Sequence, residues 1–305
     1  MKFYILTSSD LEGVWRNTQV IPHEETVVVI NSQSDNYRAV AKNFCIRNSL
    51  EYYITESDGT PATGKNSVIK LFLESNNDYM VQIDGDDQIT PRGVNLYKAM
   101  SQSKDCPDMV ALYRQPRFRK ILDFDAFIHI INDLRGGCNE DWGLEYPYDK
   151  SWMLSPSADW LTSFMKREHK VGIEKATEWA NARTAFNKAM QLYSDVNEYM
   201  MRMVFYSRNI AEEVCFDNNL LVGEDTIQFL KLKKLAFEGK YNILRRKERH
   251  YPSYVQLKNY NSITVSQSKQ TMWDWIPPFM DTLNTIKHEL PEGYSLPELH
   301  DGTYI

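Results

Sequence analysis

Residues 79–87 read Tyr-Met-Val-Gln-Ile-Asp-Gly-Asp-Asp, a short apolar stretch that runs directly into three carboxylates around one glycine. The apolar part, Tyr79 to Ile83, predicts a buried strand. Carboxylates as close as Asp84, Asp86 and Asp87 repel one another, so such a cluster is most stable around a hard divalent cation. Mg²⁺ or Mn²⁺ held in this way commonly carries phosphates. Because Asp-Gly-Asp-Asp is also ordinary turn chemistry, the rest of the chain must decide between a metal and diphosphate site and a solvated turn.

The residues before this stretch alternate between strand and helix patterns. The pattern predicts three further strands and two helices: strands at Lys2 to Leu6, Thr26 to Ile30 and Glu51 to Thr55, a helix behind Ser34 and Asp35, and a helix from Lys65 to about Glu74. This order indicates an α/β fold with a doubly wound, mostly parallel sheet that binds ligands at the carboxyl ends of its strands. The aspartates lie at such an end. A long helical pattern follows from about 173 to 203, and the chain beyond 250 is expected to be loop-like.

Length and composition indicate a globular protein, with 305 residues of which 42% are hydrophobic. There is no run of about 18 apolar residues, and the apolar stretch after Lys2 is too short for a signal peptide. The four cysteines include no Cys-x-x-Cys pair, which argues against a zinc site or a disulfide framework. We therefore expect a soluble, intracellular protein in the cytoplasm, with no membrane partner.

The net charge is −6, which argues against a generic nucleic-acid binder. Two segments depart from this trend. Residues 114–120 carry four bases and no acid, and residues 231–249 carry eight bases against two acids, so together they sum to +10 and leave −16 on the rest of the chain. A solvated helix face and a surface for an anionic ligand or partner both explain such runs, and both interpretations stay open here.

One interpretation of the phosphate chemistry is a P-loop. Gly59 to Asn66 reads Gly-Thr-Pro-Ala-Thr-Gly-Lys-Asn between a predicted strand and a predicted helix, which fits the G-x-x-x-x-G-K part of that motif. The position after Lys65 should be a Ser or Thr that binds Mg²⁺, and it is Asn66. A P-loop-like nucleotide kinase or NTPase that uses Gly59 to Lys65 is therefore kept as an alternative.

The other interpretation takes the same residues together with the motifs that follow. The Lys65-Asn66 pair at a helix start, followed by an apolar strand that ends in Asp84-Gly-Asp86, resembles glycosyltransferases of the GT-A fold, particularly family 2, where Arg-Asn is usual at the first position. Gly223-Glu224-Asp225, after a strand-like stretch at 203–208, resembles the Glu-Asp motif of the inverting members. A P-loop protein has no reason for this order of motifs.

This resemblance implies a nucleotide-diphospho-sugar transferase-like GT-A fold with a helical insertion and a C-terminal tail. It implies a metal-dependent glycosyltransferase of class EC 2.4, which transfers a sugar from a nucleoside diphosphate sugar to an acceptor hydroxyl with inversion. By the same resemblance, Asp225, with Glu224 beside it, is expected to be the catalytic base. Asp84 and Asp86 would bind Mn²⁺ or Mg²⁺, and His250 is the best placed histidine for a further ligand.

The resemblance also assigns residues to the donor, for which a UDP-sugar is favoured. Lys65 and Asp84 are expected to contact it. Thr7 and Ser8 stand where Pro-Thr-Tyr-Asn is usual after the first strand, and Asn31 stands where an acid is usual after the second.

Four segments follow from this assignment. They are a nucleotide-sugar-binding half at 1–113, a helical and aromatic insertion on the acceptor side at 114–202, a catalytic Glu-Asp segment at 203–250, and a wrap-around tail at 251–305. The acceptor stays open between a glycan, a small molecule and a hydroxymethylated pyrimidine in DNA bound by the basic segments 114–120 and 231–249. The last case would suit a phage-type enzyme working in the host cytoplasm. The sequence does not indicate an oligomeric state.

Overall fold

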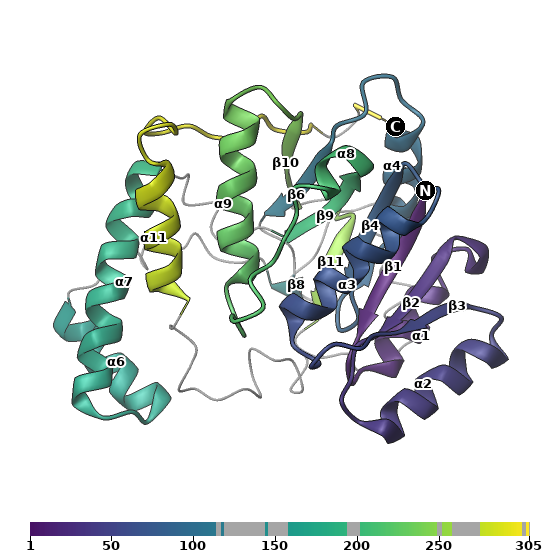
Figure 1. Cartoon of the computed structure of the whole chain (residues 1–305), viewed down its shortest axis with the longest axis horizontal. Coiled ribbons are helices and arrows are strands. Elements are labelled where there is room, and N and C mark those ends of the chain that lie inside the picture. The colour runs from purple at the N-terminus through teal and green to yellow at the C-terminus, as the bar shows by residue number, and fades with distance from the viewer. Residues whose placement is uncertain are drawn as a thin grey trace.

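The computed structural model describes residues 1–113, 117–118, 144–145, 158–193, 202–248, 252–257, 275–300 and 303–304. A seven-stranded sheet with the order β10-β6-β9-β4-β1-β2-β3 forms its centre (Figure 1). The strands are β1 (Lys2–Thr7), β2 (Thr26–Ile30), β3 (Glu51–Ile54), β4 (Tyr79–Asp84), β6 (Met109–Tyr113), β9 (Arg202–Ser207) and β10 (Ile243–Lys247). Every neighbouring pair is parallel except those of β9, which runs antiparallel to β4 and β6. The predicted α/β class with a mostly parallel sheet is confirmed.

Helices cover both faces of this sheet. They are α1 (Leu11–Thr18), α2 (Asp35–Arg47) and α4 (Pro91–Ser101) on one face, and α3 (Pro61–Glu74), α8 (Arg208–Ala211) and α9 (Glu224–Phe237) on the other. Side chains alternate along β1, so each face of the sheet has its own core. Phe3 and Ile5 lie in the core beneath α1, α2 and α4, while Tyr4 lies in the core beneath α3, α8 and α9. A strand buried on both faces needs apolar side chains at nearly every position, as β2 and β6 have.

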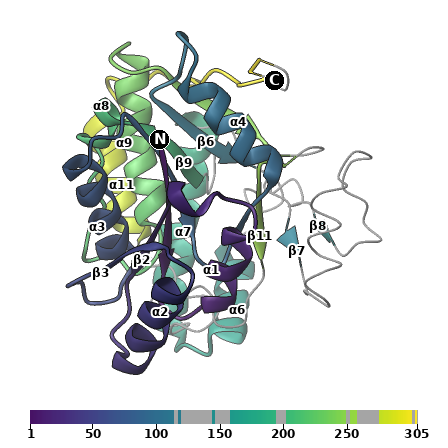
Figure 2. The ribbon, with the colours of Figure 1, turned by 90° about the vertical axis from the view of Figure 1, so that its right-hand side faces the viewer.

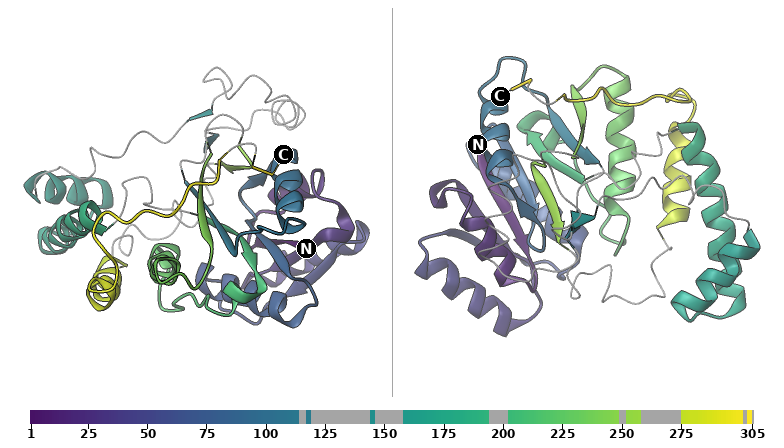
Figure 3. Two further views of the ribbon diagram at one scale, coloured as in Figure 1. Left: turned by 90° about the horizontal axis from the view of Figure 1, so that it is seen from above. Right: turned by 180° about the vertical axis from the view of Figure 1, so that it is seen from behind.

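A further layer of helices packs outside α9. It consists of α11 (Ile276–Ile286), α7 (Ile173–Tyr193) and α6 (Ala158–His169), with α11 lying between α9 and α7 (Figures 1 and 3). Phe186 of α7 packs edge-on against Trp275 and Phe279, with ring centroids 5.1 and 4.9 Å away. The described helices of the insertion are therefore joined to α9 through α11.

A second, smaller sheet lies beside the first and has the order β5-β11-β7-β8 (Figure 2). Its strands are β5 (Gln88–Ile89), β11 (Tyr254–Leu257), β7 (Arg117–Phe118) and β8 (Leu144–Glu145). Near the C-terminus, residues 297–299 run along β10, where the Arg245 amide donates to the Pro297 carbonyl and the Leu299 amide to the Arg245 carbonyl.

The structure corrects several boundaries. The helical pattern from 173 to 203 ends as helix α7 at Tyr193, and Met203 lies in β9, because its alternating apolar residues complete the central sheet. The expectation of a loop-like chain beyond 250 is wrong, since β11 and α11 both lie there. Helix α3 begins at Pro61 rather than Lys65, because proline suits the first helical turn.

Candidate functional site

The aspartate segment is held against the end of β1 by close backbone packing. In the parallel register, Leu6 lies opposite Asp84, and the Gly85 amide donates to the Leu6 carbonyl over 2.7 Å. A Cβ on Gly85 would lie only 2.7 Å from that carbonyl oxygen, and a Cβ on Gly13 of α1 would lie 1.8 Å from the Gly85 carbonyl oxygen. Gly85, between the aspartates, is thus needed to bring the three carboxylates together at the carboxyl ends of β1 and β4.

The three carboxylates form one cluster. Asp84, Asp86 and Asp87 each offer an oxygen within 4.8 Å of the others. Arg202, the first residue of β9, pairs with both Asp84 and Asp87, at 3.2 Å to Asp87. The Tyr254 hydroxyl accepts from the Asp84 amide and donates to the Asp87 carboxylate. Asp87 is buried by these contacts, at 2% exposure.

Asp86 differs from its neighbours. In the described part of the chain it makes no hydrogen bond or ion pair with another residue. Burial raises the pKa of the Asp86 carboxyl and Asp10 adds to this, while Lys65 and Arg16 lower it. An unpaired carboxylate beside two more is the donor set that Mg²⁺ and Mn²⁺ prefer. The residues therefore fit a divalent cation, with Asp86 as the ligand that is open to it.

The Glu-Asp pair lies at the start of α9, and a glycine positions it. Gly223 has a φ of +84° and precedes the first helical turn, which contains Glu224 and Asp225. A Cβ on Gly223 would lie 2.3 Å from Cγ of Trp275. Only glycine combines this backbone conformation with such close packing against the residue that begins α11.

Lys65 of α3 binds both acids of this pair. Its Nζ lies 2.8 Å from Oε1 of Glu224 and 2.5 Å from Oδ1 of Asp225. Burial lowers the pKa of the Lys65 ammonium, but Asp225 and Glu224 outweigh it and hold the pKa above its usual range. Burial raises the pKa of Glu224, and Lys65 opposes this. Lys65, predicted to contact the donor, is committed to the Glu-Asp pair in this structure.

Asn66 explains why its neighbour is so placed. Its amide nitrogen donates to the Phe216 carbonyl and to Asn218, and its oxygen accepts from the Phe216 amide. Lys65 and Asn66 therefore bind both ends of the segment from Phe216 to Asp225 that leads into α9. The segment from Gly59 also lacks the form of a P-loop, because residues 61–65 already belong to helix α3 and cannot wrap around a phosphate.

The predicted donor residues lie at the carboxyl ends of β1 and β2. The Thr7 hydroxyl, 1% exposed, contacts the Tyr37 hydroxyl and the Asp10 carbonyl, while Ser8 is partly exposed. Asn31 is buried: its amide nitrogen donates to the Thr60 carbonyl, and its oxygen accepts from Thr55 and Ser57. Asn31 thus orders the loop before α3. Of the three, Ser8 is the side chain that is open to a ligand.

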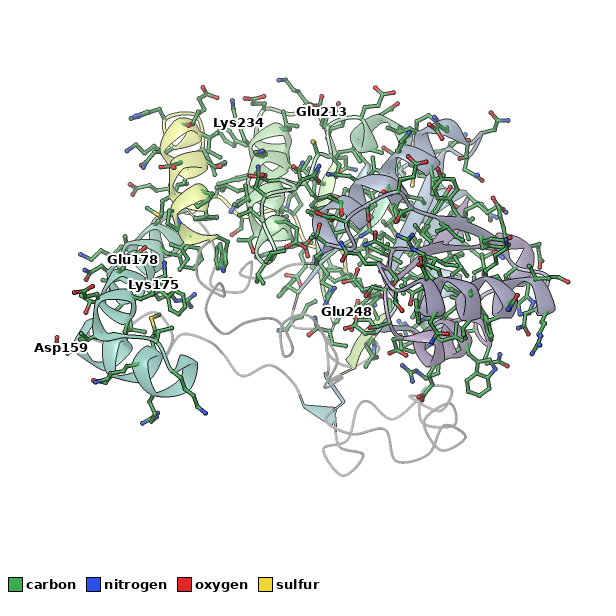
Figure 4. All side chains as sticks on the ribbon, turned by 60° about the horizontal axis from the view of Figure 1, so that its bottom comes forward. Asp159, Lys175, Glu178, Glu213, Lys234 and Glu248 are labelled. Carbon is green, nitrogen blue, oxygen red and sulfur yellow. The ribbon has the colours of Figure 1, made fainter. Side chains whose placement is uncertain are left out.

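His250 lies outside the described residues, but those on either side of it approach the cluster. Glu248 is fully buried; it accepts from the amide and hydroxyl of Ser253 and from the amide of Tyr254 (Figure 4). Tyr254 in turn contacts Asp87. Burial raises the pKa of Glu248, while Arg246 lowers it. This network fixes Tyr254 beside the aspartates.

The sequence did not single out Arg202 or Tyr254. A signal existed for Arg202, because it directly precedes the strand-like stretch predicted at 203–208, and an antiparallel neighbour of β4 starts where β4 ends. For Tyr254 there was none, since it follows the basic segment in a part of the chain expected to be loop.

The basic segment 231–249 does not form one helix face, because it divides between α9 and β10. Lys234 pairs with Glu238 and with Glu289 beside α11 (Figure 4). Further bases are buried or paired: Lys233, Lys240, Arg245 and Arg246. Arg249 and most of the segment 114–120 lie outside the described residues. Much of the charge that suggested DNA binding is therefore balanced within the chain.

None of the described helices combines the length and apolar character that crossing a membrane requires. No protein-family model matches the sequence, and no curated protein matches it.

Among solved structures, the fold is similar to those of S. aureus TarS. TarS 1-349 in complex with UDP-GlcNAc is 14% identical with a TM-score of 0.48, covering 95% of this chain and 66% of that chain. TarS 1-349 in complex with UDP is 15% identical with a TM-score of 0.40, covering 85% and 61%. TarS itself is 15% identical with a TM-score of 0.46, covering 93% and 43%. The chain thus spans about two thirds or less of the length of the solved chains that it matches.

Proposed function

We propose that the protein is a metal-dependent glycosyltransferase that transfers a sugar from a nucleoside diphosphate sugar to an acceptor hydroxyl. One observation carries the proposal. An aspartate cluster with an open carboxylate, Asp86, and a Glu-Asp pair both lie at the carboxyl ends of the parallel strands. Lys65 joins them electrostatically, since it binds Asp225 and also lowers the pKa of Asp86. A reaction in which a diphosphate leaves and a hydroxyl attacks needs both kinds of group side by side.

The aspartate cluster is the donor side of the proposal. Asp86 would hold Mn²⁺ or Mg²⁺, and Asp84 would help to hold it or orient the donor. A bound divalent cation supplies positive charge against the oxygens of the leaving diphosphate. Ser8 lies at the end of β1 with a partly exposed side chain, where it would contact the nucleotide. A UDP-sugar is the donor that we favour.

The Glu-Asp pair is the acceptor side. Its two carboxylates differ in exposure, because the side chain of Glu224 is 7% exposed and that of Asp225 27% exposed. Asp225 is therefore the one that can reach a substrate hydroxyl, and we assign it as the general base for an inverting attack. Glu224 would hold Lys65 and so keep the pair in position.

Lys65 limits this base in the free protein, because its ammonium group contacts the Asp225 carboxylate that an acceptor hydroxyl would have to approach. The diphosphate of a bound donor would compete for Lys65. In this proposal Lys65 moves toward the diphosphate, so that the Asp225 carboxylate is free to meet the acceptor hydroxyl when the donor is present.

Product mass after incubation with sugar nucleotides tests the proposal. The panel pairs UDP-, GDP- and TDP-sugars with glycan, small-molecule and hydroxymethylated DNA acceptors, with Mn²⁺ or with EDTA. We expect an acceptor whose mass increases by one sugar, only with metal. ATP or GTP hydrolysis without any sugar transfer would favour the kinase or NTPase alternative and contradict the proposal.

The DNA acceptor stays one member of that panel. Lys231 and Lys247 are the bases of segment 231–249 that have no ion pair within the described residues, so they are the ones that can meet phosphates. If DNA is the acceptor, Lys231→Glu with Lys247→Glu should weaken DNA binding and reduce its salt dependence. Unchanged binding across salt concentrations would leave a neutral glycan or small molecule as the acceptor.

A further inference from the structure

Arg202 occupies the position beside the aspartate cluster that a cation would take. It reaches from the start of β9, next to β4 in the sheet, and its guanidinium contacts Asp84 with one nitrogen and Asp87 with the other. One arginine thus bridges two of the three carboxylates that form the candidate metal site. The planar guanidinium is suited to this, because it presents several donors in fixed directions.

This contact divides the cluster into a closed and an open part. Asp87, 2% exposed, is held by Arg202 and by Tyr254. Asp84 is partly exposed, and among the described residues its carboxylate pairs with Arg202 alone. Asp86 has no such partner in the described part of the chain. A divalent cation can therefore meet Asp86 directly, but it can share Asp84 only if the guanidinium leaves.

We propose that Arg202 is the internal counter-ion of the aspartate cluster and competes with a divalent cation for Asp84. This inference rests on the proposed function for the identity of the metal site. With Arg202 in place, the three carboxylates carry a net charge near −2, which keeps the cluster folded without metal and lowers its affinity for free cations. Binding of a cation to Asp84 displaces the guanidinium toward solvent, where its side chain is already 25% exposed.

Three variants separate this role from a purely structural one. Arg202→Gln removes the charge, and Arg202→Lys keeps it. Arg38→Gln is the matched control, because Arg38 has a similar side-chain exposure of 29% and pairs with a single carboxylate, Asp35, at the start of α2. The measurement is binding of Mn²⁺ alone, without nucleotide, by electron paramagnetic resonance of the free ion, with circular dichroism to establish that each variant is folded.

We expect Arg202→Gln to bind Mn²⁺ at least about tenfold more tightly than the wild type, because one positive charge within a few ångströms is removed. Arg202→Lys and Arg38→Gln should stay close to the wild type. Equal or weaker Mn²⁺ binding by a folded Arg202→Gln overturns the proposal and leaves Arg202 as a structural ion pair. Tighter binding by Arg202→Gln without any transfer activity in the wild type would support the counter-ion role and contradict only the proposed function.

A second measurement uses the wild-type protein and so does not depend on a variant that folds. Phenylglyoxal reacts with accessible guanidinium groups, and peptide mass spectrometry reports the extent at each arginine. Saturating Mn²⁺ should increase modification of Arg202 severalfold and leave Arg38 unchanged. Modification of Arg202 that stays constant or decreases with Mn²⁺ would show that the guanidinium is not displaced, and would overturn the competition.

Discussion

Two acidic groups lie at the carboxyl ends of the parallel strands, and each is paired with one basic residue in a different way. At the end of β4, Arg202 binds Asp84 and Asp87 and leaves Asp86 unpaired among the described residues. At the start of α9, Lys65 binds both Glu224 and Asp225. The first group keeps an open ligand, while the second is closed by its own lysine. The same residue types can therefore serve a metal in one place and a proton transfer in the other.

The difference follows from where each cation comes from. Arg202 lies on a neighbouring strand, and its side chain is 25% exposed. Lys65 is buried beneath α9 with its Nζ 5.5 Å from the centre of the Phe216 ring. A buried ammonium ion with two carboxylates is costly to separate, because a charge left alone in the interior loses its solvation. We therefore expect the Glu-Asp pair to respond to loss of its cation mainly through stability, and the aspartate cluster mainly through metal affinity.

The largest effect should come from Asp225. Replacing it with asparagine should lower turnover by about 10² to 10⁴, the usual contribution of a general base, with donor affinity nearly unchanged. Steady-state kinetics on the acceptor found in the product screen, together with donor binding, measures both. Turnover that survives in Asp225→Asn would show that this carboxylate only stabilises the start of α9 and is not the general base. The Glu-Asp pair would then not differ in function from the aspartate cluster in the way proposed.

Lys65 should give the next largest effect. Lys65→Met leaves Glu224 buried without its partner and should destabilise the fold by about 3 kcal/mol at neutral pH, whereas Lys65→Arg retains the charge and should cost less. Urea unfolding of both variants gives the comparison. A loss for Lys65→Met no larger than that of Lys65→Arg would show that the ion pair does not stabilise α9 against α3.

This loss should depend on pH in a definite direction. Burial already raises the pKa of Glu224, and removal of Lys65 raises it further. A carboxyl whose folded-state pKa is raised binds its proton more tightly in the folded than in the unfolded chain, so the penalty is full above the folded-state pKa and disappears below the unfolded value near about 4.3. The stability difference between Lys65→Met and the wild type should therefore shrink as the pH falls. A difference that grows at low pH contradicts this assignment.

Gly223 offers a smaller and more local test of how the Glu-Asp pair is placed. Gly223→Ala meets both the positive φ and the indole of Trp275, and should cost about 2–4 kcal/mol. Gly239 has a similar φ of +72° with nothing near its missing Cβ, so Gly239→Ala should cost only about 1 kcal/mol. Thermal unfolding of both variants compares them. Equal losses would mean that the packing of α11 on Gly223 does not position the pair.

The smallest expected effect is at Asp58, in the loop before the helix that carries Lys65. Hydrogen bonds from Thr63 and Thr60 lower the pKa of this carboxyl. A depressed pKa contributes stability above the unfolded value, about 3.9, which is lost as the pH falls through the folded value. The melting temperature of the wild type should therefore fall slightly more than that of Asp58→Asn on acidification below about pH 4. Parallel curves would contradict the prediction.

The sequence predicted the strands and helices that carry this site better than the contacts between its side chains. Strand β4 with its aspartates and the helix start at Glu224 carry local patterns, apolar runs and acids in the first helical turn, that can be recognised without knowing the partners. The contacts of Lys65 and Asn66 with residues about 150 positions later could not be read from the sequence. The same holds for Arg202, whose partners are fixed only by the antiparallel insertion of β9 beside β4.

The pairing of charges also gives information that composition alone could not give. The basic run at 231–249 had two interpretations, and the structure shows long-range ion pairs at Lys234 and Arg245 that no local pattern indicates. Their acidic partners Glu289 and Glu298 lie in the tail, which was expected to be loop-like. Long-range pairing of this kind depends on the path of the chain between elements. The hydrophobic periodicity of the sequence gives no information about that path.

Calorimetric titration of the favoured UDP-sugar donor into three proteins, each with Mn²⁺ and with EDTA, tests the central distinction most directly. We expect metal-dependent donor binding in the wild type and in Asp225→Asn, and its loss in a folded Asp86→Asn, because in the proposed function Asp86 binds the metal and the Glu-Asp pair faces the acceptor. Donor binding that is equally tight in EDTA, or that survives in Asp86→Asn, would contradict it.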